Sequence, residues 1–339
     1  MNSSIFKTAA LAATTILFFS CDRTVSPERE TSEQCEISVA INGINLETRS
    51  TDLKPTSDES RYRDATILVY GKDTGMLESY KEWKGSPVKF TLDKGEKVFY
   101  ALLNAGSDIA TKSGTVNDLL GNVATLKNDL SGFFMMGTNN VNVVDKSAST
   151  TITVTRAAAK ISFEQVSLNF DSPALAALSF SIDAVMVINA TGDISYNAVS
   201  SNQASYSPQV WYNKRNYTSG DCNKYLYDSS IARTLANGKS TTLGSVLYTY
   251  PNFTATDSHA TQWSPRKTRV CLKCTLGTET VYYPLTLDTV GPNKYYTVKA
   301  LTITKKGVSN PDDEWDDAES SGNIIIGDWF DGGDITETL

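Results

Sequence analysis

The fold is decided by the stretch Glu36-Ile-Ser-Val-Ala-Ile-Asn-Gly-Ile-Asn-Leu-Glu-Thr-Arg49. Five large apolar residues recur in it: Ile37, Val39, Ile41, Ile44 and Leu46. The first three alternate with smaller residues in the two-residue period of a half-buried strand. Gly43 shifts the parity, so a bulge there is needed to bring all five side chains onto one face. A polar segment with the composition of an exposed, protease-accessible loop follows Arg49, so a core strand is joined to its domain by an easily cut segment.

Length and composition predict two domains built mostly of strands. The chain has 339 residues, which suits two domains of roughly 100 to 200 residues each. Its 16 tyrosines and 21 glycines, with abundant Thr, Ser and Asn, favour strands and turns, so we expect an all-β fold with one or two short helices. The net charge of −7 argues against nucleic acid as a partner, because phosphate binding needs a concentrated basic face.

The N-terminus has the pattern of an export signal. Lys7 precedes an apolar run at 9–19 that is too short to span a bilayer and suits the core of a signal peptide. Leu17-Phe-Phe-Ser-Cys21 resembles a bacterial lipobox, in which the cysteine is lipidated. We therefore interpret residues 1–20 as a lipoprotein signal peptide and 21–35 as a polar tether. The alternative is an ordinary signal peptide that ends near an unmodified cysteine.

The four other cysteines give no clear metal or disulfide pattern; they are Cys35, Cys222, Cys271 and Cys274. The last two form a CxxC motif, but no second CxxC exists and the chain has one histidine, so a zinc site is disfavoured and no cofactor is expected. In a strand, an i, i+3 pair is about 10 Å apart and points to opposite faces, beyond disulfide reach. Either Cys222 bridges to one of this pair, or the thiols are free and buried.

The first domain is expected to span residues 36–158. Alternating or apolar runs predict strands at 65–70, 88–92, 97–103, 133–137 and 150–155. Asp93-Lys-Gly95 predicts a hairpin between the second and third of these strands. Apolar residues at three- and four-residue spacing predict a helix from Thr115, its N-cap, to Leu130.

The second domain is expected to span residues 159–339. Strands are predicted at 166–170, 180–189, 247–250, 268–276, 281–287 and 295–304. The polar segment 190–243 is interpreted as long surface loops with short ordered pieces, and 310–321 as a solvated acidic linker. The apolar end of the chain, at 322–339, is interpreted as a terminal strand that stands off its domain.

Four stretches, taken in order and spacing, resemble the fimbrillin family, the type V pilus subunits of Bacteroidales. They are Cys21 with the strand that ends at Arg49; Ala65 to Tyr70; Thr153-Val-Thr-Arg156 running into Ala159-Lys-Ile161; and the end from Tyr295 through Asn310-Pro311 to Trp329. The similarity spans nearly the whole chain. It implies two transthyretin-like β-sandwich domains in tandem and export as an outer-membrane lipoprotein precursor.

The resemblance also implies roles for both ends. In these pilins an Arg- or Lys-specific protease removes the lipidated N-terminus with the first strand, and a C-terminal strand of the next subunit fills the groove. The cut corresponds to Arg49-Ser50, with Lys54, Arg61 and Arg63 as alternatives. The removed strand, 36–49, carries Ile37, Val39, Ile41, Ile44 and Leu46. The donor strand, 322–339, carries Ile324, Ile325, Ile326, Trp329 and Phe330.

The partners implied are other copies of the chain and related fimbrial subunits in a head-to-tail polymer on the cell surface. The protease is a further partner, as is the outer membrane, which holds the lipidated precursor before cleavage. Two alternatives stay open. One is a non-polymerising surface lipoprotein, an anchor or tip subunit. The other is a secreted glycan-acting enzyme, disfavoured because no motif sets a catalytic acid beside a base.

Replacing Cys21 by alanine should abolish palmitate labelling of the precursor, because the lipid is expected on the thiol that follows the signal peptide. Metabolic labelling of the wild type and of Cys21→Ala measures this directly. Labelling that persists in the variant would show that another residue carries the lipid.

Overall fold

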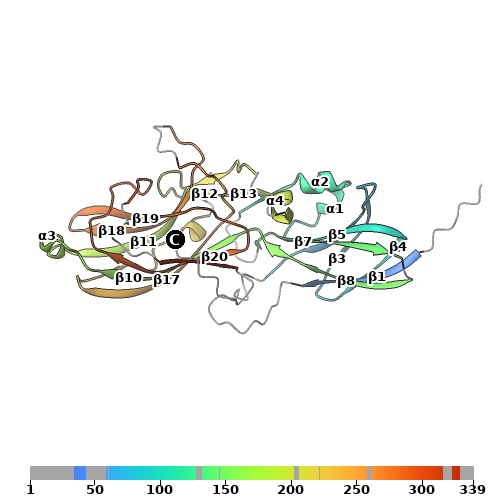
Figure 1. Ribbon diagram of the computed structural model, residues 1–339, viewed down its shortest axis with the longest axis horizontal. Helices are drawn as coiled ribbons and strands as arrows, with labels where there is room; N and C mark the ends of the chain where they lie inside the picture. The colour runs from blue at the N-terminus through green and yellow to red at the C-terminus, as the bar shows by residue number, and fades with distance from the viewer. Residues whose placement is uncertain are drawn as a thin grey trace, which may run out of the picture. The chain divides into compact units, whose positions relative to one another are not determined.

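The computed structural model describes residues 34–42, 59, 61–126, 132–144, 146–201, 206–220, 222–257, 262–315 and 323–328 (Figure 1). All of these residues belong to one compact unit. Cys21, Arg49, Ser50 and Lys54 lie outside the described residues, and so do Gly43, Ile44, Leu46, Trp329 and Phe330.

Two sheets contain most strands of the first half of the chain. The three-stranded sheet has the order β4-β1-β8: β1 (Gln34–Asn42), β4 (Val88–Asp93) and β8 (Ser147–Thr153). The five-stranded sheet has the order β3-β2-β5-β7-β9: β2 (Ala65–Gly71), β3 (Leu77–Glu82), β5 (Gly95–Leu103), β7 (Met135–Val143) and β9 (Thr155–Arg156). Phe90 of β4 meets Phe99 of β5 edge to face, with ring centroids 6.1 Å apart, so these sheets pack face to face.

Two further sheets contain most strands of the second half. One has the order β17-β10-β20-β21: β10 (Ala159–Leu168), β17 (Lys239–Thr249), β20 (Lys294–Ile303) and β21 (Asn323–Asp328). The other has the order β15-β11-β18-β19, with β16 also on β11: β11 (Phe180–Ile188), β15 (Tyr227–Asp228), β16 (Arg233–Thr234), β18 (Thr268–Leu276) and β19 (Glu279–Leu287).

The remaining described elements are short. Two strand pairs are β12 (Ala190–Thr191) with β14 (Trp211–Tyr212), and β6 (Val123–Thr125) with β13 (Asp193–Ser195). The helices are α1 (Ile109–Lys112), α2 (Val116–Leu120), α3 (Pro173–Ala176), α4 (Tyr196–Ser201) and α5 (Asn223–Leu226). None of these helices is long and apolar enough to cross a membrane. The all-β prediction is confirmed, although the described part has more helices than the one or two expected.

Sheet membership changes where β9 ends and β10 begins. Strands before Ala157 pair almost entirely among themselves, and so do those after Ala158; the exception is β6, which pairs with β13. This agrees with the strand pattern that placed a boundary near residue 158. The division into domains at that residue remains a prediction.

The hairpin predicted between β4 and β5 is wrong, although both strands exist. β4 pairs with β1 in one sheet, whereas β5 pairs with β2 and β7 in the other. Gly95 takes a φ of 126°, open chiefly to glycine, at the corner where the chain crosses between sheets. The crossing buries Phe90 and Phe99 against each other, which a flat hairpin in one sheet would not do.

The predicted helix 115–130 begins as expected and ends early. The Thr115 side chain accepts from the Asp118 amide, and the Asp118 carboxylate accepts from the Thr115 amide, which is a capping box. The helix ends at Leu120, where the Asn122 side chain donates to backbone carbonyls of the last turn. The chain then enters β6, and Val123, predicted on the apolar helix face, is 49% exposed.

The segment 190–243 has the short ordered pieces expected, but much of it is buried. Asp193 accepts hydrogen bonds from the backbone amides of Gln209 and Val210 and from the Tyr206 hydroxyl. Because these contacts satisfy polar backbone groups away from water, the segment contributes to the core, including Tyr225 and other large side chains. Its interpretation as surface loops is therefore wrong.

The cysteines of the CxxC motif are thiols on opposite faces of β18, as the strand geometry predicted. Cys274 lies in the main core, and Cys271 packs in a separate cluster with Met186 and Ile188. Burial raises the pKa of Cys271. Cys222 directs its thiol to the Leu126 carbonyl at 3.2 Å, so the alternative of a bridge to this pair is not formed.

Candidate functional site

The first strand, β1, is the central strand of its sheet. Gln34 to Val39 pair antiparallel with β4, and Glu36 to Asn42 pair parallel with β8 (Figure 1). β4 and β8 contact the sheet through β1 and do not pair with each other. Removing β1 would therefore leave one unpaired edge on each of two facing strands.

The inward face of β1 is apolar and fully buried. Cys35, Ile37 and Val39 have no exposed surface, and Ile41 is partly buried. Directly opposite them stand apolar residues of both neighbours: Cys35 faces Leu92, Ile37 faces Phe90 and Ile41 faces Ile152. Burying a large apolar side chain contributes about 1.5 to 3 kcal/mol.

Cys35 was missed by the sequence analysis, which placed it in the polar tether. Its position two residues before Ile37 continues the same alternation, and this signal could have identified it. The alternation predicted for Ile37 and Val39 is confirmed. The bulge at Gly43 and the inward orientation of Ile44 and Leu46 stay predictions.

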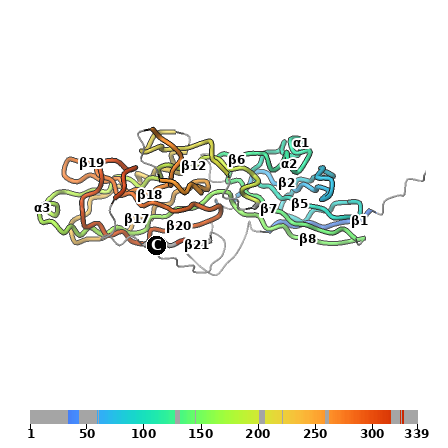
Figure 2. The backbone as a smooth tube through the Cα atoms, turned by 45° about the horizontal axis from the view of Figure 1, so that its top comes forward, coloured from blue at the N-terminus to red at the C-terminus, as the bar shows by residue number. Residues whose placement is uncertain are grey.

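The last described strand, β21, is an edge strand of its own sheet. It pairs antiparallel with β20, and Figure 2 shows the two side by side. Ile324 is 8% exposed and Ile326 is partly buried against the core; Ile325 lies between them in the same strand. The expectation that this strand stands off its domain is wrong, because its backbone finds an open ladder on β20.

The acidic segment before β21 is not a solvated linker throughout, as the sequence analysis expected. Asp312 is 4% exposed, and its carboxylate accepts from Arg266 Nη1 at 2.6 Å, Arg269 Nη1 at 3.1 Å and Asn189 Nδ2 at 2.8 Å. A buried carboxylate persists only when paired and hydrogen-bonded in this way. The chain is thus fixed at Asp312.

Residues on either side of Asp312 are docked as well. Val308 exchanges both backbone hydrogen bonds with Tyr282 of β19, at 2.8 and 2.9 Å. The Trp315 ring packs edge-on against Tyr283, with centroids 4.9 Å apart. The polar lead to β21 is therefore the seven residues 316–322, which extend to at most about 25 Å. This is shorter than the solvated linker that the sequence predicted at 310–321.

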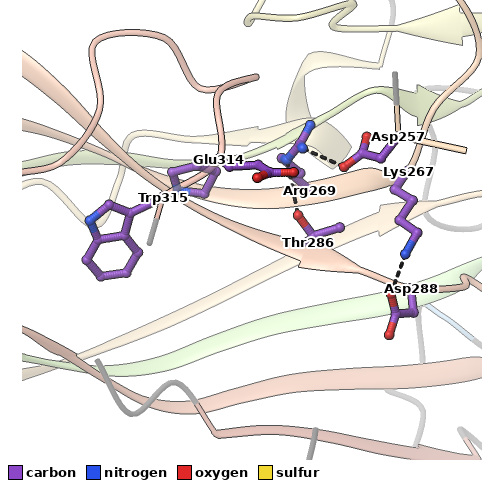
Figure 3. A pocket seen from close by; sticks show the side chains of 8 residues that line it. Asp257, Lys267, Arg269, Thr286, Asp288, Glu314 and Trp315 are labelled. Atoms are coloured by element: carbon purple, nitrogen blue, oxygen red, sulfur yellow. Dashed lines mark hydrogen bonds and ion pairs between the residues drawn. The ribbon is translucent and has the colours of Figure 1, made fainter. Parts of the chain in front are cut away.

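A cavity of about 660 Å³ lies beside this docked segment, lined by Asp257, Lys267, Arg269, Pro284, Thr286, Asp288, Glu314 and Trp315 (Figure 3). Its charged groups are engaged with partners: Lys267 Nζ lies 2.5 Å from Asp288, Arg269 Nη2 lies 2.6 Å from Asp257, and Glu314 also interacts. The Trp315 indole points away from these ion pairs in Figure 3. Asp257 and Asp288 thus each form an ion pair with a basic side chain that lines the same cavity.

Among the described residues, no group of three or more His, Cys, Asp or Glu side chains is arranged to hold a metal ion. The charged clusters that do occur combine carboxylates with buried cations. They fix segments of the chain in place.

Comparison with known proteins identifies the fold. No protein-family model matches the sequence, and no curated protein matches it. Solved structures do match. A candidate cell adhesion protein from Bacteroides eggerthii aligns with a TM-score of 0.63 at 17% identity, covering 88% of this chain and 97% of that one. Another, from Parabacteroides distasonis, aligns with a TM-score of 0.59 at 14% identity, covering 87% and 96%.

A fimbrilin (FimA) from Porphyromonas gingivalis aligns over 83% of this chain and 93% of that chain, with a TM-score of 0.57 and 17% identity. The all-β sandwich fold of this chain is therefore that of the Bacteroidales fimbrillins and related adhesion proteins.

Replacing Asp312 by asparagine should lower the free energy of unfolding by about 3 to 5 kcal/mol, because the buried Arg266 loses its carboxylate partner and the buried Arg269 loses one carboxylate and keeps Asp257. Urea unfolding followed by circular dichroism measures the change. Asp313→Asn is the matched control: Asp313 is exposed, so its substitution should stay within about 0.5 kcal/mol of wild type. Equal stability of the two variants would contradict the role given to Asp312.

Proposed function

We propose that this chain is a structural subunit of a surface fimbria, made as a lipoprotein precursor that is lipidated at Cys21. A trypsin-like protease cuts after Arg49 and releases the first strand, and the subunits then polymerise by donor-strand exchange to serve cell adhesion. The observation that carries the proposal is the central position of β1, which joins two strands that do not otherwise meet. Its likeness in fold to a fimbrilin supports the same function.

Loss of β1 creates a binding site for another strand. The N–H and C=O groups of β4 and β8 that face β1 lose their partners, and the apolar trough beneath Cys35, Ile37 and Val39 is exposed to water. Natural proteins normally avoid such open edges because they template pairing with other chains. Here that property is the means of assembly.

The strand suited to fill this site is β21 of another copy. Among the described strands of its own sheet, β21 pairs only with β20, so its release breaks one ladder of backbone hydrogen bonds. Insertion between β4 and β8 forms two such ladders. Ile324 and Ile326 repeat the two-residue spacing of the buried side chains of β1. In the sequence, Phe330 has the same even parity as Ile324 and Ile326, and Trp329 immediately precedes it.

The contact between donor strand and groove is head to tail. The donor leaves the sheet β17-β10-β20-β21, and the groove lies in the sheet β4-β1-β8. An interface that joins two different surfaces leaves a groove free at one end of each assembly and a donor strand free at the other, and it propagates as a filament wherever the rotation between subunits does not close a ring. The partners of the chain are therefore other copies of itself and related subunits, and we propose no enzymatic activity.

Replacing Arg49 by alanine should accumulate uncut precursor and leave it monomeric, because β1 continues to occupy the groove. The measurement is electrophoresis of unboiled cell extracts, with N-terminal sequencing of the main band. A variant that forms the normal ladder of polymers while β1 is still attached would contradict the proposal.

Replacing Ile324 and Ile326 together by aspartate should leave a subunit that is exported and cut but does not polymerise, since a charge in an apolar groove costs several kcal/mol. Sedimentation and electron microscopy of the cut protein measure assembly, and circular dichroism confirms folding. Leu178→Asp, at a site that is 46% exposed, is the control and should assemble normally. Full-length filaments from the well-folded double variant would rule out assembly through β21.

A further inference from the structure

The segment between β1 and β2 contains four basic residues at which a trypsin-like protease can cut: Arg49, Lys54, Arg61 and Arg63. The choice of bond matters, because after a cut next to Asp64 the retained chain would begin immediately before β2, a fully buried strand of the neighbouring sheet. The described part of this segment shows which bonds the fold protects.

Glu59 is held on both its backbone and its side chain. Its carbonyl oxygen accepts from Arg156 Nε at 2.9 Å. Its carboxylate lies 3.0 Å from Lys160 Nζ and accepts from the Tyr248 hydroxyl. Glu59 is 1% exposed. Its partners Arg156, Lys160 and Tyr248 come from β9, β10 and β17, so this cluster of contacts fixes the chain at residue 59.

The partners of Glu59 are themselves rigidly placed. Arg156 is fully buried at the end of β9, and Lys160 also faces the Tyr295 ring at 5.3 Å. Burial lowers the pKa of Arg156 to about 10, so this residue keeps its charge at neutral pH. The carboxylate of Glu59 supplies the negative charge that pairs with Lys160 in this buried site. Release of residue 59 would therefore leave buried cations behind.

The next residues are tied to Asn104. Arg63 donates its amide to Asn104 Oδ1 at 2.9 Å, Asn104 Nδ2 donates to the Arg61 carbonyl at 3.4 Å, and the Asn104 amide donates to the Asp64 carbonyl at 2.9 Å. Tyr62 packs on Trp83, with ring centroids 5.5 Å apart. The side chains of Arg61 and Arg63 are exposed, but their backbone is held.

A protease binds its substrate as an extended segment of several residues, so cutting at Arg61 or Arg63 requires local opening of these contacts. Lys54 has a different obstacle, since Pro55 follows it. Proline lacks the backbone N–H, and its ring restricts the preceding residue, which makes a Lys-Pro bond a poor substrate for trypsin-like enzymes.

We infer that the Glu59 cluster and the Asn104 tie form a proteolytic stop, which shields Arg61 and Arg63. Because Pro55 disfavours a cut after Lys54, processing is then confined to the Arg49–Ser50 bond. This inference rests on the processing step of the proposed function. Hydrolysis adds the hydroxyl of water to the Arg49 carbonyl carbon and its proton to the Ser50 amine. The retained chain then starts at Ser50 and stays attached to its sheets from Glu59 onward.

The test is limited trypsin digestion of the purified full-length protein, with mass spectrometry and N-terminal sequencing of the products over time. Within residues 34–64 the wild type should give a new N-terminus at Ser50 first. A first N-terminus at Tyr62 or Asp64 would overturn the protection, and one at Pro55 would overturn the part given to Pro55.

Two variants test the stop itself. Glu59→Gln removes the buried counter-charge, and Asn104→Gly removes the side-chain hydrogen bonds while accepting the backbone φ of 60° at that position. Each should speed cutting at Arg61 and Arg63 by on the order of 100-fold. Glu82→Gln, at an exposed carboxylate paired with Lys84, is the control and should digest as wild type.

Unchanged cutting at Arg61 and Arg63 in both folded variants would overturn the inference, and Asn104→Gly provides the test if Glu59→Gln does not fold. The digestion reads out the site without any polymer. A cut between Arg49 and Ser50 that is not followed by assembly would support the stop and count against donor-strand exchange. If the wild type were cut after Arg63 and then assembled, the stop would be overturned and donor-strand exchange supported.

Discussion

The structure depends on the two hydrogen-bond ladders that β1 makes at once. β4 and β8 belong to one sheet only because β1 lies between them, antiparallel to the first and parallel to the second. A strand in that position cannot be lost without replacement, because the backbone groups of both neighbours would remain unpaired beside an apolar trough. The same geometry makes the sheet selective for an occupant that is a strand with an apolar residue at every second position.

Buried charges mark the points where the chain stays attached next to both end strands. Asp312 is fixed by Arg266 and Arg269 before β21, and Glu59 is fixed by Lys160 and Arg156 after the loop that follows β1. Such clusters contribute little net stability compared with apolar packing, but they require one geometry and resist partial opening. In the proposed assembly they would set the limits of the segments that are released.

The sequence predicted features whose cause is local. The two-residue alternation identified β1 and the opposite orientation of Cys271 and Cys274, and the Thr115 cap identified the start of α2. It failed where the cause lies far along the chain. Nothing near Asp312 reveals that Arg266 and Arg269, more than 40 residues earlier in the chain, bind its carboxylate in the interior. The sequence therefore predicted a solvated linker there. The crossing of β4 and β5 between sheets likewise depends on β1, β2 and β7.

In the assembly proposed for this chain, cleavage controls polymerisation because it lowers the effective concentration of β1 at its own groove. While the loop is intact, β1 competes for the groove as part of the same molecule, at an effective concentration of about millimolar for a short linker. A donor strand from another copy, at far lower concentration, cannot displace it even if its contacts are equal. Once the loop is cut, β1 is a separate peptide that is held only by its lipid anchor, so it no longer stays with the subunit after each dissociation, whereas β21 remains covalently part of a folded subunit. The proposed exchange would then proceed in one direction without requiring β21 to bind the groove more tightly than β1 did.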